Sequence, residues 1–170
     1  MPNNKIHQGL IAEVKRILNP FQKKLLIEKQ GGVGLIQVFS KEKMTEGEKN
    51  KFKIALSDML LLDDYHQPFI VIEPETSSSP KTFGRSIPVY AVARQIIADK
   101  PYQIKSPLFL IIVITDDKKN PGQKKYQLED LQHKIKNAIK LEGSLLADFD
   151  FCQISDFENT IGKVIDASLR

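Results

Sequence analysis

Apolar residues recur along the chain at two spacings, which divide it into helices and strands. Over Lys5–Leu18 they fall at every third or fourth position, which predicts an amphipathic helix, and Phe21–Lys29 is expected to continue it beyond Pro20. Val33–Phe39 has the composition of a short strand. The nearly continuous apolar run Leu108–Thr115 is typical of a strand buried on both faces.

The middle of the chain predicts a β-hairpin. Phe52–Leu62 fits either a helix or a strand, and a strand is favoured because the segment leads into a polar turn at Asp63–Gln67. After Pro68, the β-rich run Phe69–Ile72 supplies the second strand. The other expected elements are a helix at Ser86–Ala98 with Pro88 in its first turn, a linker framed by Pro101 and Pro107, a polar loop at Asp116–Lys125, a helix at Leu128–Leu141, a strand at Phe149–Ile154 and a helix at Phe157–Leu169.

These elements predict one α/β domain over residues 1–170, with helices around a mixed central sheet. Its core would cover about residues 50–116, with an N-terminal helix at 5–29 and a helix, strand and helix at 126–169. The single cysteine, Cys152, is expected to be a small core residue in a reducing cytosol. Because the chain has no membrane-length apolar run and no signal-peptide pattern, a cytoplasmic protein without a membrane partner is expected.

Charge is distributed unevenly along the chain. The net charge of +4 is compatible with a polyanionic partner. Lysines crowd three segments, whereas four acidic residues lie close together near the hairpin. Carboxylates for a cation, with lysines and arginines for phosphates, are what metal-assisted phosphodiester chemistry requires. The lysine-rich segments are Lys41–Lys53, Lys118–Lys125 and Lys134–Lys140, and the acidic residues are Asp63, Asp64, Glu73 and Glu75.

Three carboxylates are expected to converge at the open end of the hairpin. Glu73 and Glu75 are two positions apart on a strand and share a face, with Pro74 between them. Asp58 reaches the same end if the strands pair around the turn at Asp63–Gln67. Such a cluster repels itself unless a cation neutralises it, and Mg²⁺, with Mn²⁺ as a substitute, suits oxygen ligands. Pro74 places the pair at a sheet edge, a bulge or a strand end.

The stretch from Ser57-Asp58 through Ile72-Glu73-Pro74-Glu75 resembles the core of the PD-(D/E)XK nuclease superfamily over about twenty residues. The flanking helix, and the helix and strand that follow, extend the resemblance loosely to about residue 116. Ser57 stands in place of the proline, and Glu75 in place of the usual lysine. The resulting Glu-x-Glu pattern is similar to that of some type II restriction endonucleases of the BamHI kind.

The resemblance implies a restriction-endonuclease-like sandwich and a Mg²⁺-dependent endonuclease that hydrolyses phosphodiester bonds of double-stranded DNA. Asp58 and Glu73 would bind metal, together with Glu75, which would also orient or deprotonate the attacking water. Lys81 is an alternative source of the missing positive charge. A type II restriction enzyme of this kind would act as a homodimer on a palindromic site. Repair, junction-resolving and nicking enzymes of the same fold remain open.

The loop after the acidic strand is a candidate DNA-binding segment. Ser77, Ser78, Ser79, Lys81 and Arg85 could hold backbone phosphates, or could belong to a flexible loop before a helix. Base recognition has no clear signature, although the lysine-rich segment that begins at residue 118 is a candidate.

Other residues have less specific interpretations. Asp63 and Asp64 are expected to be turn residues, and would replace Asp58 only if Phe52–Leu61 were helical. Glu13 could add a carboxylate from the first helix, or be solvated. The histidines His7, His66 and His133 share no metal-ligand spacing and are expected at the surface.

No P-loop or dinucleotide fingerprint is present, so no nucleotide cofactor is expected. Two rival interpretations remain beside the nuclease. One is a catalytically inactive domain of the same fold that binds DNA or a protein partner. The other is an unrelated α/β protein in which the three carboxylates never meet.

Overall fold

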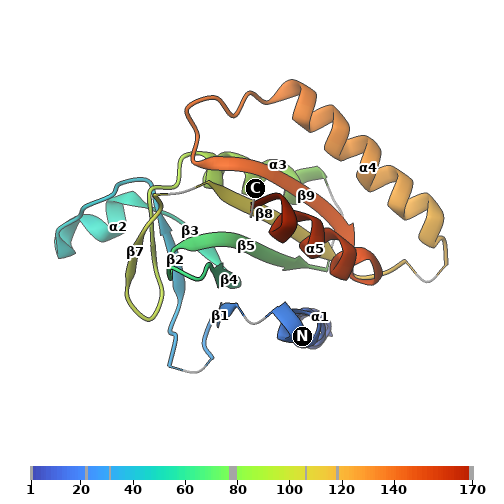
Figure 1. Ribbon diagram of the computed structural model, residues 1–170, viewed down its shortest axis with the longest axis horizontal. Helices are drawn as coiled ribbons and strands as arrows, with labels where there is room; N and C mark the ends of the chain where they lie inside the picture. The colour runs from blue at the N-terminus through green and yellow to red at the C-terminus, as the bar shows by residue number, and fades with distance from the viewer. Residues whose placement is uncertain are drawn as a thin grey trace.

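The computed structural model describes residues 2–21, 23–30, 32–76, 80–105, 107–117 and 119–168. Its centre is a five-stranded sheet in the order β1, β4, β5, β8, β9 (Figure 1). The first three are antiparallel neighbours, and β5, β8 and β9 run parallel. The mixed α/β class predicted from the sequence is therefore confirmed. The strands are β1 (Lys24–Ile27), β4 (Met59–Leu62), β5 (Pro68–Glu75), β8 (Leu108–Ile114) and β9 (Leu146–Gln153).

One face of this sheet packs on α1 (Pro2–Leu18) and α5 (Phe157–Ser168). Alternate strand residues such as Met59 and Ile111 point into this layer, as the twofold period of a strand requires. Cys152 is buried here, as expected from the sequence. None of the helices that the structure describes is long and apolar enough to span a membrane.

The opposite face packs on α3 (Pro80–Ala91), α4 (Pro121–Ala138) and a second sheet. The strand residues that point into it include Leu60 and Ile112, whose neighbours along each strand face the other layer. Leu108–Ile114 is thus enclosed on both faces and between two strands, which accounts for its unbroken apolar sequence.

The second sheet was not predicted, although two of its strands lie in segments expected to be strands, Val33–Phe39 and Phe52–Leu62. Phe52–Leu62, expected as one strand, is divided at Asp58 between the two sheets. The second sheet is antiparallel throughout, in the order β3, β2, β6, β7. Figure 1 shows β2, β3 and β7 together with the short helix α2 at one end of the molecule. The elements are β2 (Ile36–Phe39), β3 (Lys53–Ser57), β6 (Gln95–Ile97), β7 (Pro101–Gln103), a 3-10 turn (Glu46–Glu48) and α2 (Lys49–Phe52).

Two expected helical segments are strands instead. The N-terminal helix ends at Leu18, and the segment expected to extend it contains β1, whose apolar residues pair with the buried strand β4. The helix expected at Ser86–Ala98 begins at Pro80 and ends at Ala91, and β6 follows it. Pairing of β6 with β2 buries Ile96, so tertiary contacts override the apparent helical spacing.

Prolines account for most of the remaining boundary shifts. Pro88 lies in the last turn of α3, whereas Pro80 takes the first-turn position expected for Pro88. Pro121 begins α4, so this helix starts earlier than the predicted Leu128. Part of the expected linker between Pro101 and Pro107 forms β7. The strand and helix predicted near the C-terminus are confirmed as β9 and α5.

Candidate metal centre

Asp58 lies at the bend where the chain leaves the four-stranded sheet and enters the five-stranded sheet, between β3 and β4. Met59 pairs with Ile72 in the antiparallel register, so the next position outward brings Asp58 level with Glu73. The predicted hairpin is confirmed, and it brings these two residues to the same end of the sheet. Asp58 is accessible there, with 22% of its side chain exposed.

Glu73 is a buried carboxylate enclosed by protein donors. Its side chain accepts hydrogen bonds from the Tyr90 hydroxyl on α3, the Ser57 hydroxyl and the backbone N–H of Asp58. Burial raises the pKa of Glu73 to about 8, and the negative charge of Asp58 adds to the increase, while the three donors oppose it. Glu73 therefore holds a proton near neutral pH unless a positive charge approaches.

Tyr90 is the hydrogen-bond donor to Glu73 from α3. Burial, followed by the charge and hydrogen bond of Glu73, raises the pKa of the Tyr90 hydroxyl well above its ordinary value. The hydroxyl therefore keeps its proton near neutral pH and remains a hydrogen-bond donor. Because Tyr90 is only 2% exposed, it connects the carboxylate directly to the hydrophobic layer.

Glu75 is the more accessible member of the strand pair. It is half-buried, and burial raises its pKa, with a further increase from Asp58 and a decrease from His7. Pairing of β5 with β4 ends at Ile72, whereas pairing with β8 continues to Glu75. Pro74 therefore lies beyond the end of β4, where its missing N–H costs no bond to that strand.

His7 is a site residue that the sequence interpretation missed. It lies on α1, and its Nε2 is 3.2 Å from Asp58 Oδ2. Its signal was present, since His7 precedes Leu10 and Ile11 by three and four positions and so shares the buried face of the helix. The expectation of a surface histidine is therefore corrected to a half-buried residue in contact with an acidic one.

Glu13, the other first-helix candidate, is not part of the site. Its carboxylate is paired with Arg16 on the same helix at 2.8 Å. The hydrogen bond from Arg16 lowers the pKa of Glu13. It therefore fits the alternative of a solvated helix residue.

The side chains at this site limit how a metal ion could be bound. Among the described residues, no group of three or more histidine, cysteine, aspartate or glutamate side chains is arranged to hold one. Mg²⁺ needs fewer protein ligands, because it is often bound by one or two carboxylates together with water and substrate phosphates. Asp58 and Glu75 fit that requirement. Glu73 already has protein donors, and a cation would relieve the repulsion between it and Asp58.

The turn of the hairpin lies at the other end of β4 and β5, as the register requires. Asp63 accepts hydrogen bonds from the N–H groups of Tyr65 and Gln67, and Asp64 forms an ion pair with Lys23 at 2.6 Å. Asp63 and Asp64 are turn residues, as predicted. His66 lies in the same turn, away from Asp58.

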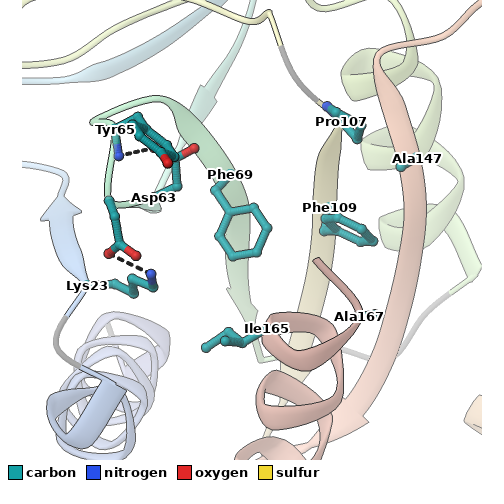
Figure 2. Close-up of a pocket in the computed structure, with 10 residues that line it drawn as sticks. Lys23, Asp63, Tyr65, Phe69, Pro107, Phe109, Ala147, Ile165 and Ala167 are labelled. Carbon is teal, nitrogen blue, oxygen red and sulfur yellow. Dashed lines mark hydrogen bonds and ion pairs between the residues drawn. The ribbon is translucent and has the colours of Figure 1, made fainter. Parts of the chain in front are cut away.

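A mainly apolar cavity of about 440 Å³ lies beside this turn. Figure 2 shows Phe69 and Phe109 on neighbouring strands, with Ile165 of α5 across from them. The two rings meet edge to face at a centroid distance of 5.9 Å. The ion pair of Lys23 is at its edge. These walls offer packing surface but no set of groups for phosphodiester hydrolysis.

Two polar cavities lie nearer to the carboxylates. One, of about 300 Å³, is lined by Asp58, three residues of α1, and the end of β1 with the turn that follows it. The other, of about 460 Å³, lies beyond the carboxyl ends of β5 and β8 and is lined by Thr76, Asp116, Asp117, Lys119 and Lys124 among others. The second includes part of the lysine-rich segment considered for base recognition.

The candidate DNA-binding loop is only partly described. Ser77, Ser78 and Ser79 lie outside the described residues. Lys81 lies in the first turn of α3, and its side chain is not described. Arg85 is on the same helix and exposed, so it is available to a large ligand.

Comparison with models of protein families gives no match to this chain, and comparisons with curated proteins and with solved structures give no significant match either.

Proposed function

We propose that the chain is a metal-dependent nuclease that hydrolyses phosphodiester bonds of double-stranded DNA. The observation that carries the proposal is the position of Asp58, Glu73 and Glu75 at one end of the hairpin. Burial, followed by the negative charge of Asp58, raises the pKa of both glutamates there. Carboxylates kept close together at a cost are typical of functional sites rather than of solvated turns.

We include in this proposal that the fold is a restriction-endonuclease-like sandwich. A helix precedes three antiparallel strands, and a helix and a parallel strand follow, which agrees with a restriction-endonuclease-like sandwich. Asp58 directly precedes the second of these strands, and Glu73 and Glu75 lie at the end of the third, which is compatible with the order that the resemblance implies. A type II restriction endonuclease acting as a homodimer is the narrower form of the proposal.

The chain's own residues divide the work at this site. Asp58 and Glu75 are the accessible carboxylates that would hold Mg²⁺, while Glu73 is fixed behind them by Tyr90 and Ser57. Mg²⁺, when bound, supplies an activated water and stabilises the charge that develops on the phosphate. His7 orients the Asp58 carboxylate through their contact. Glu75 accepts the proton of the attacking water.

Incubation of supercoiled plasmid with the purified chain tests the proposal. Cleavage is expected with Mg²⁺ or Mn²⁺ and not with EDTA, and loss of activity by at least about a hundredfold is expected for Asp58→Asn and for Glu73→Gln. Asp130→Asn, an exposed aspartate paired with Lys134 on α4, is the matched control and should remain active. Cleavage that persists in both site variants would refute the site.

A catalytically inactive DNA-binding domain is the second candidate. Two observations favour it: Glu73 is already satisfied by three protein donors, and Glu75 replaces the usual lysine. Salt-sensitive binding to duplex DNA without cleavage under any divalent ion would support this candidate over the nuclease.

A further inference from the structure

A polar cavity of about 300 Å³ lies between α1 and the turn that follows β1, and Asp58 forms part of its wall. We propose that this cavity binds a backbone phosphate of the nucleic acid, and that Lys29 supplies the positive charge that the lysine position occupied by Glu75 lacks. The inference rests on the proposed nuclease function and names residues on which that function would depend.

The cavity is built onto the candidate metal centre. The backbone N–H of Glu28 donates to the carbonyl of Asp58 at 2.9 Å, which ties the turn to the bend where Asp58 lies. From the other side, His7 contacts the Asp58 carboxylate at 3.2 Å. A ligand in the cavity would therefore lie against Asp58.

Lys29 is held on a defined turn while its ammonium group stays accessible. Its φ of 59° is in the left-handed region, which residues other than glycine seldom adopt. Its N–H donates to the carbonyl of Gly34 at 2.8 Å, which closes the turn. The side chain is 74% exposed, and its ion pair with Glu28 is long, at 3.7 Å. A phosphate oxygen can replace that weak partner.

Two other lining side chains can form hydrogen bonds with a phosphodiester. The side-chain amides of Gln8 and Gln30 provide N–H donors for phosphate oxygens and acceptors for sugar or base groups. Asp58 and Glu28 make the cavity locally negative, so a phosphate needs an opposing cation there. Lys29 is the lysine that lines this cavity.

The polar cavity beyond β8 is a weaker candidate for the same role. Asp116 and Asp117 form part of its wall, and Asp117 accepts hydrogen bonds from the backbone N–H groups of Lys119 and Asn120. That carboxylate orders its own loop. None of the three carboxylates of the candidate metal centre lines the cavity.

The test measures affinity for a fluorescein-labelled duplex of about 20 base pairs by anisotropy in EDTA, over a range of salt concentrations. Lys29→Asn removes the charge, and asparagine tolerates the left-handed backbone better than most residues do. Lys29→Arg keeps the charge. Lys15→Gln removes an exposed charge on α1, about two turns after His7, and is the matched control. Unfolding temperatures of all variants are compared to verify folding.

The Lys29→Asn variant loses one phosphate contact, so it should bind the duplex about eightfold more weakly than the unmodified chain at about 0.1 M salt. The slope of log K, the association constant, against log salt concentration should decrease in magnitude by about 0.9. Lys29→Arg and Lys15→Gln should retain the affinity and slope of the unmodified chain. A labelled nucleoside monophosphate, tested in parallel, should bind more weakly than the duplex by at least about a hundredfold, since it offers a single phosphate.

Four results would overturn the inference. Unchanged binding by Lys29→Asn, or an equal loss in Lys15→Gln, would reject the cavity while leaving the proposed nuclease function intact. Tight, Lys29-dependent binding of the monophosphate without duplex binding would assign the cavity to a free nucleotide instead. Absence of duplex binding by the unmodified chain would overturn the cavity, and the Mg²⁺-dependent plasmid assay then decides separately whether the nuclease proposal stands.

Discussion

Replacement of Glu73 by glutamine should stabilise the protein at alkaline pH. The folded pKa of Glu73 is raised from 4.5 to about 8. Between these values the unfolded chain loses its proton while the folded chain keeps it, so the stability that this group provides decreases as pH increases. From about pH 5 to about pH 8 the free energy of unfolding should fall by about 3 kcal/mol through Glu73 alone.

Glu73→Gln removes this titration and keeps the side-chain volume and an oxygen acceptor for Tyr90. Relative to the unmodified chain, the variant should therefore gain about 3 kcal/mol on going from about pH 5 to about pH 8. Urea unfolding at several pH values in EDTA measures the gain. The same substitution should abolish cleavage, so stability and activity should change in opposite directions.

Glu142→Gln is the control for this prediction, because Glu142 is an exposed glutamate in the loop before β9. Its unfolding curve should follow that of the unmodified chain across the whole pH range. A Glu73→Gln variant whose stability also runs parallel to the unmodified chain would refute the claim that buried Glu73 keeps its proton when the protein folds.

Three further substitutions test other parts of the account. Tyr90→Phe should cost about 1 kcal/mol of unfolding free energy near pH 6, where Glu73 is protonated, and about 2 kcal/mol near pH 9, where the lost hydrogen bond is to a charged group. Urea unfolding at both pH values measures the two costs, and equal costs would contradict the prediction. His7→Ala should reduce cleavage by about ten- to a hundredfold through misorientation of Asp58, with less than about 1 kcal/mol lost in unfolding; a stability loss without an activity loss would make the contact merely structural. Ile112→Ala, in the fully buried strand β8, should cost about 2–5 kcal/mol in urea unfolding, and a cost under about 1 kcal/mol would contradict the assigned burial.

The central hairpin was predictable because its signals were local and consistent. A proline, a polar turn and two apolar runs fixed the pairing around Asp63–Gln67, and the pairing then brought Asp58 to Glu73. The same reasoning identified Leu108–Ile114, since an unbroken apolar run of that length fits a strand buried on both faces.

Segments containing β2 and β3 were predicted as strands, but the second sheet was missed because the pairing of β2 with β6 joins segments distant in sequence. Its strands are short, and β6 follows α3 so closely that the apolar residues of the two elements merge into one apparent helical pattern. Gln95–Ile97 is a strand because it pairs with β2, which lies far away in sequence, and with the short strand β7 on its other side. β1 was taken for helix for the same reason, since its partner strand begins at Met59.

In the candidate site, too, local features were predictable from the sequence and contacts between distant segments were not. The acidic residues were found because they lie within one hairpin. The contact of His7 with Asp58 spans 51 positions in the sequence, and the hydrogen bond from Tyr90 to Glu73 spans 17. Neither follows from spacing along the chain, although the helical period did place His7 on the buried face of α1.

Binding of a divalent cation by the carboxylates around Asp58 is the claim on which the nuclease proposal depends. Titration of the metal-free chain with Mn²⁺, followed by the paramagnetic resonance of the free ion, measures it without any substrate. Saturable binding is expected for the unmodified chain and for Asp130→Asn, and its loss is expected in Asp58→Asn. Equal binding by Asp58→Asn, or no binding by the unmodified chain with or without duplex DNA, would contradict the account.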